Sequence, residues 1–226
     1  MPTFPELHSL VKAYPELHVL ARRFESVSDS APIDTDFVQE LAYSYLEPAK
    51  SAAVQFERFS VPVLTDYLRR SHADYLNRVL PEISARIAVL CEHYEDPAIE
   101  KALLPLFRRF SEDLKAHIAL EEEIYFPYAV ELDSGCARER GPMGKTAGRN
   151  YSTEAFEAHH PDHDREIDML DRLLEKLEIR YSGDMAFRTL RRKIGSFKRD
   201  LHLHCLIEDE VLTTKLKTAE KRLKRG

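Results

Sequence analysis

Glycine and cysteine are both scarce in this chain of 226 residues. Four of the seven glycines fall within one segment, Gly135 to Gly148, so regular structure elsewhere has few flexible interruptions. The three cysteines, Cys91, Cys136 and Cys205, are odd in number and widely spaced. This spacing argues against a disulfide framework and suits a reducing compartment.

Long apolar runs are also missing, and the N-terminal stretch MPTFPELHSL does not have the pattern of a signal peptide. We therefore expect a cytoplasmic protein without a membrane partner. The formal net charge of −6 argues against a nucleic-acid partner. The length allows one large domain, or one domain with a small appendage.

An apolar stripe with two polar members runs through the stretch LKAHIALEEEIYFPY, residues 114–128. Steps of three and four residues, typical of a core-facing helix, select Leu103, Phe107, Phe110, Leu114, His117, Glu121, Ile124 and Tyr128. His117 and Glu121 lie one turn apart within this stripe. A buried carboxylate is expensive unless it is paired or binds a metal, so something cationic is expected opposite.

A second stripe repeats the pattern further along the chain. Its members are Leu190, Ile194, Phe197, Leu201, His204, Glu208 and Val211. An i, i+4 pair points in one direction on a helix, and one such pair arises easily by chance. Two pairs on the core stripes of separate helices favour a shared metal site over the alternative, a hydrogen-bonded polar core.

The chain is predicted to be all-α, with a small helical N-terminal segment at residues 1–50 and an antiparallel four-helix bundle at residues 51–226. Asp36 should begin a short helix after a turn-rich link. The predicted long helices are Pro62–Tyr94, Pro97–Leu132, Thr153 or Pro161 to Arg180, and Ser182 to Arg222. Pro81 should kink the first of them or mark a local break. The glycine-rich residues 133–152 are predicted to form a long crossover or a lid over a site.

Short turns at Asp96-Pro97 and Ser182-Gly183 predict two antiparallel helical hairpins. Residues equidistant from such a turn lie side by side, which places His72 beside Glu121, and His163 beside His202, two residues short of His204. The six candidate metal ligands are therefore His72, His117, Glu121, His163, His204 and Glu208.

Other histidines compete for this set of ligands. His159 and His160 are alternatives to His163 at a similar height. His93 lies roughly 30 Å along a continuous helix from His72, beside the turn, so it is predicted to be a cap or surface residue. His202 and Cys205 point away from the face of His204. Imidazole and carboxylate ligands without thiolates suit iron, manganese or zinc, and two carboxylates able to bridge favour a pair of ions.

The chain resembles the hemerythrin-like (HHE) cation-binding family, and within it the di-iron proteins that repair iron–sulfur clusters under nitrosative and oxidative stress. The similarity covers about residues 60–215. It is carried by SHADYLNRVLPEI around His72, HIALEEEIYFPY with His117 and Glu121, HDREIDML at His163, and DLHLHCLIEDEVL with His204 and Glu208. The resemblance implies two irons held by those six residues and bridged by the two glutamates and an oxygen. Some descriptions of the family would add His93.

The resemblance leaves three functions open. The first is a stress-response di-iron protein that repairs iron–sulfur clusters or reacts with nitric oxide or peroxide; its partners would be O2 or NO and iron–sulfur client proteins. The second is a dioxygen-binding sensor or storage protein, and the third a metal-free helical interaction domain. In the repair proteins a stretch like LVKAYPELHVLARRF precedes a cysteine pair, whereas here ESVSDSAPIDTD follows it without cysteine. Enzyme status and oligomeric state stay open.

Overall fold

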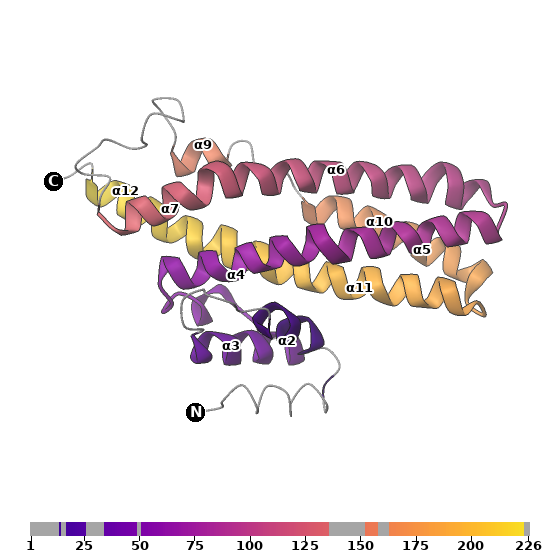
Figure 1. The fold of residues 1–226 in the computed structure, drawn as a ribbon, viewed down its shortest axis with the longest axis horizontal. Coiled ribbons are helices and arrows are strands. Elements are labelled where there is room, and N and C mark those ends of the chain that lie inside the picture. The colour runs from indigo at the N-terminus through magenta and orange to yellow at the C-terminus, as the bar shows by residue number, and fades with distance from the viewer. Residues whose placement is uncertain are drawn as a thin grey trace. The chain divides into compact units, whose positions relative to one another are not determined.

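The computed structural model describes residues 14, 17–25, 34–48, 51–135, 152–157 and 163–223. These residues form helices and their connections, and the part of the chain so described contains no β-strand (Figure 1). The all-α class predicted from the sequence is confirmed. Two compact units emerge: a terminal unit, up to Ser71 and again from Leu203, and a central unit, from His72 to His202. The predicted domain boundary near residue 50 stays a prediction.

The central unit is built from long helices, some of which contain wider π-helical turns (Figure 1). Its elements are η4 Tyr75–Val79, α5 Leu80–His93, η5 Ile99–Leu103, α6 Leu104–Leu120, η6 Glu121–Tyr125, α7 Phe126–Asp133, α9 Thr153–Glu157, α10 His163–Tyr181 and the first part of α11 Met185–Cys205. The ends of these helices lie within a few residues of the predicted ones. Gly135 has a φ of 74°, a left-handed conformation that suits glycine and ends α7.

Two aspartates fix the turns between consecutive helices. Asp96 accepts hydrogen bonds from the backbone N–H of Ala98 at 2.8 Å and from the hydroxyl of Tyr181 at 2.6 Å. The hydroxyl and the N–H hold the pKa of Asp96 below its ordinary value. Asp184 caps α11 by accepting from the backbone N–H of Phe187 at 2.6 Å. The two predicted turns are therefore confirmed.

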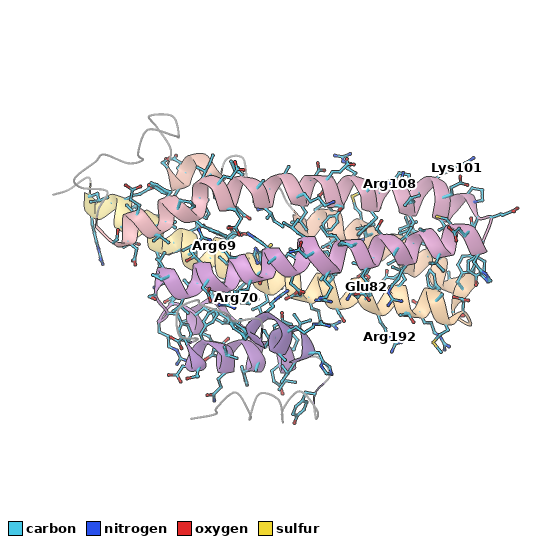
Figure 2. All side chains as sticks on the ribbon, viewed as in Figure 1. Arg69, Arg70, Glu82, Lys101, Arg108 and Arg192 are labelled. Carbon is cyan, nitrogen blue, oxygen red and sulfur yellow. The ribbon has the colours of Figure 1, made fainter. Side chains whose placement is uncertain are left out.

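Helix α11 contacts the other long helices of the central unit. Lys193 of α11 pairs with Glu82 of α5, which is labelled in Figure 2. The ring of Phe197 lies edge-on to that of Phe110 in α6, at 6.0 Å between centroids, and Lys198 of α11 forms ion pairs with two aspartates of α10. Helix α6 also packs against α5 and α10. Surface ion pairs contribute about 0–1 kcal/mol each, whereas a buried Leu or Phe contributes about 1.5–3 kcal/mol, so apolar burial holds this unit together.

Three of the π-helical turns in the described chain end two residues before a proline. These turns and prolines are η4 with Pro81, η5 with Pro105, and η6 with Pro127. A proline has no N–H and its ring collides with the carbonyl four residues earlier, and a wider turn relieves both problems. The Leu80 N–H accordingly bonds to the carbonyl of Tyr75, five residues back. At Pro81 the helix therefore continues through a π turn rather than breaking.

The predicted core stripes are buried, with one correction. On α6 and η6, the stripe is buried as far as Glu121, but Ile124 is half-buried and Tyr125 is completely buried in its place. The π turn causes this shift, because each residue of a wider turn advances through a smaller angle around the helix. The α11 residues of the second stripe, from Leu190 to Leu201, are all buried.

The terminal unit contains the first helices of the chain and the last. Its elements are α2 His18–Glu25, α3 Thr35–Leu46, η3 Ala53–Gln55, the first part of α4 Val61–Asp74, η7 Leu206–Leu212 and α12 Thr213–Leu223. The predicted short helix near Asp36 is confirmed as α3, and Asp34 caps it by accepting from the Phe37 N–H. The ring of Phe37 meets those of Phe56, Phe59 and Tyr67 edge to face, which gives this unit an aromatic core.

Within the described ranges, every helix is too short or too polar to cross a lipid bilayer.

Candidate metal centre

Glu121 is the most unusual residue of the central unit, because its carboxylate is completely buried. It begins η6, directly after α6. Its Oε1 lies 2.5 Å from Nε2 of His117, and its Oε2 lies 3.2 Å from Nε2 of His72. Each carboxylate oxygen therefore faces a different imidazole. This is the arrangement that a carboxylate bridging two cations would offer.

His72 lies in the last turn of α4 and is 2% exposed. Both of its ring nitrogens face carboxylates, because Nδ1 lies 2.8 Å from Oε1 of Glu122 while Nε2 faces Glu121. The imidazole also stacks on the ring of Phe126, with centroids 5.4 Å apart and planes 12° from parallel. The sequence placed His72 beside Glu121, and this prediction is confirmed. The contacts from Glu122 and Phe126 were not predicted.

His117 occupies the last turn of α6, one turn before Glu121. Phe156 of α9 stacks against its ring at 6.2 Å and against the ring of Tyr125 at 3.7 Å. Phe156 and Tyr125 are both buried. An apolar layer therefore borders this imidazole, and it strengthens electrostatic interactions nearby by keeping water away.

The terminal unit contains the second predicted pair. His204 lies near the end of α11 and Glu208 lies in η7. Both are buried, and Nε2 of His204 lies 3.4 Å from Oε2 of Glu208. The i, i+4 spacing thus brings this imidazole and carboxylate together on a buried face, as predicted. Cys205 is half-buried and His202 is exposed, whereas His204 is buried. The prediction that these two side chains point away from the face of His204 is therefore confirmed.

Both buried glutamates stand in π-helical turns, which the sequence analysis did not anticipate. The Phe126 N–H bonds to the carbonyl of Glu121, and the Thr213 N–H bonds to the carbonyl of Glu208. Such turns are rare and occur frequently at functional sites, where they re-aim side chains. For Glu121 a signal was present in the sequence, namely Pro127 just beyond the turn. No proline follows Glu208 within its turn, so there the sequence carries no such signal.

The remaining candidate histidines have different outcomes. His163 begins α10, but its side chain lies outside the described residues, as do His159 and His160, so the choice among the three stays a prediction. His93 ends α5 and is exposed, with its ring 4.6 Å from that of Tyr94. The prediction that His93 is a surface residue is confirmed.

The donor chemistry of the central unit fits a metal ion that binds imidazole and carboxylate, iron among them. Glu121 offers one carboxylate oxygen to Nε2 of His72 and the other to Nε2 of His117, so its two oxygens are ligand atoms beside two imidazoles. Imidazole nitrogen and carboxylate oxygen suit iron, manganese or zinc. A buried carboxylate shared by two imidazoles also has the balance of charge that a divalent cation would complete.

Comparisons with models of known protein families and with curated proteins give no match to this chain.

Proposed function

We propose that the chain is a non-haem di-iron protein of hemerythrin-like type, with a four-helix bundle around the metal centre. The observation that supports it most is the buried carboxylate of Glu121, which faces the Nε2 atoms of both His72 and His117. Apolar helices rarely retain such a carboxylate unless something cationic balances it. Bundle interiors are a usual place for paired metal ions held by carboxylates and imidazoles.

In this proposal the second buried pair completes the ligand set. His204 and Glu208 would add one imidazole and one carboxylate to the ligands His72, His117 and Glu121, as the spacing in the sequence predicts. His163, at the start of α10, would be the sixth ligand. Glu121 and Glu208 would supply the carboxylate ligands of the two ions.

Bound iron would supply redox chemistry and open coordination positions for a diatomic molecule or a peroxide. The protein's part is to hold the ligands and exclude water. Phe126 stacks on His72, Phe156 stacks on His117, and Tyr125 backs Phe156; all three rings are buried. A dry, apolar surrounding of this kind controls solvent access and redox potential.

Among the uses of such a centre, we propose a cytoplasmic role in the response to oxidative or nitrosative stress, through iron–sulfur cluster repair or through chemistry with NO or peroxide. Two of the six proposed ligands are carboxylates, which favours reactive or labile iron over a reversible dioxygen carrier with more imidazole. Iron–sulfur client proteins and small diatomic molecules are the proposed partners.

Metal analysis of protein purified anaerobically from iron-supplemented cells tests the centre directly. We expect two iron ions per chain and an absorption spectrum that changes when NO is added. Absence of metal after purification, together with no uptake on reconstitution, would refute the proposal. A stable, reversible complex with O2 would instead support the dioxygen-binding function. The variant Glu121→Gln should not hold the metal. Its matched control is Glu123→Gln, because Glu123 is exposed on the same turn as Glu121.

A further inference from the structure

We propose that Glu122 is a positioning residue that fixes the tautomer and orientation of His72 for metal binding. This inference rests on the proposed di-iron function and adds to it a residue outside the set of ligands. The contact that carries it is the 2.8 Å distance between Nδ1 of His72 and Oε1 of Glu122.

The two consecutive glutamates of η6 face different ring nitrogens of His72. Glu121 Oε2 lies 3.2 Å from Nε2 of His72, and Glu122 Oε1 lies at the other ring nitrogen. An ionised carboxylate can only accept a hydrogen bond, so Nδ1 of His72 must be the donor to Glu122. In the neutral ring this leaves the lone pair on Nε2, the nitrogen that points toward Glu121. Nε2 is therefore the atom available to a metal ion.

Burial separates the roles of the two carboxylates. Glu121 is 0% exposed and the Glu122 side chain is 32% exposed, so one lies in the interior and the other reaches the surface. A carboxylate on the far nitrogen of a metal-binding histidine holds the ring in place and makes the ligand nitrogen more basic. The stacked ring of Phe126 restricts the same imidazole from its face. Three contacts thus define one orientation of His72.

The role of Glu122 is tested with Glu122→Ala and Glu122→Gln, and with Glu123→Gln as the control. Glu123 is exposed on the same turn, so its variant makes the same change of charge as Glu122→Gln without touching His72. Glutamine retains an oxygen that can accept from Nδ1 but lacks the charge, whereas alanine lacks both. We expect Glu122→Ala to lower iron affinity about 10- to 100-fold in chelator competition, Glu122→Gln to lower it less, and Glu123→Gln to leave it unchanged.

A second measurement needs no metal. Nitrogen-15 NMR of the imidazoles in metal-free protein should show a proton on Nδ1 of His72 in the wild type and in Glu122→Gln, and loss of that proton, with Nε2 protonated beside Glu121, in Glu122→Ala. Wild-type protein that binds no iron would refute the di-iron proposal, while the NMR result still decides the contact. Wild-type iron affinity and an unchanged tautomer in Glu122→Ala would overturn the role of Glu122. If Glu122→Ala fails to fold, Glu122→Gln decides through its affinity relative to Glu123→Gln.

Discussion

Replacing Glu121 by glutamine is the most direct perturbation of the proposed centre. Glutamine has nearly the same size but carries no charge, and it offers one carbonyl oxygen where two carboxylate oxygens now face His117 and His72. Because Glu121 is completely buried, its charge weakens the metal-free protein unless the neighbouring imidazoles balance it. We therefore expect Glu121→Gln to lose the metal while its metal-free form is at least as stable as metal-free wild type. The double variant with Glu208→Gln should extend both effects.

The size of the effect follows from mass action. At a free metal concentration of ~100 times the dissociation constant, one site adds about 2.7 kcal/mol to the free energy of unfolding. For a chain of this length, 1 kcal/mol moves the melting temperature by about 2–4 °C, so one occupied site should raise it by about 5–11 °C. The long apolar stripes remain without metal, so the metal-free protein should stay folded but melt earlier.

Thermal melts followed by circular dichroism measure this difference. The samples are metal-loaded and metal-free forms of wild type, Glu121→Gln, the double variant, and the exposed control Glu123→Gln. Wild type and Glu123→Gln should gain stability from metal, and both Glu121 variants should not. Equal melting temperatures for loaded and metal-free wild type would show that the site is not coupled to folding. A Glu121→Gln variant that retains the full gain would show that this carboxylate is not a ligand.

Two further predictions concern single residues. His93→Ala should keep the metal and His117→Ala should lose much of it, because His93 is exposed while His117 is buried against Glu121; comparable metal loss in elemental analysis of the two would contradict this. The pKa of Asp96 is lowered mainly by the Tyr181 hydroxyl, so its contribution to stability is present at neutral pH and is lost as the pH falls below 3.8, the ordinary value for aspartate. Urea unfolding should therefore separate wild type from Asp96→Asn at neutral pH and bring the two together at acidic pH, and a gap that does not change with pH would refute the reasoning.

Local patterns in the sequence predicted most of the helical architecture. The three-four periodicity identifies the buried face of α11, and Asp96-Pro97 and Ser182-Gly183 identify the two turns, because both signals act over a few neighbouring residues. Equal distance from a turn was enough to place His72 beside Glu121. These inferences need only helix geometry and a short connection.

The residues around the ligands were harder to predict. Tyr125 replaces Ile124 in the core because a π turn changes the register, and that turn ends two residues before Pro127. The contact of Phe156 with His117 joins residues far apart in the chain across a long connection. Periodicity within one helix contains no information on either feature. The contact between Glu122 and His72 depends on which side of η6 faces His72. Tertiary packing decides this, and the sequence of one helix does not.

The arrangement around His72 also separates a metal centre from a polar core on electrostatic grounds. If Nδ1 donates its proton to Glu122, the lone pair of Nε2 faces a carboxylate oxygen of Glu121 at 3.2 Å. Two lone pairs directed at each other repel, so this geometry requires a positive charge between them. A second proton on His72 would supply it only by burying an imidazolium ion, whereas Nε2 of His117 can reach the other oxygen of Glu121 as a neutral donor. Metal ions satisfy both imidazoles in their neutral form and use both oxygens of one carboxylate, which is why we favour metal binding for this cluster.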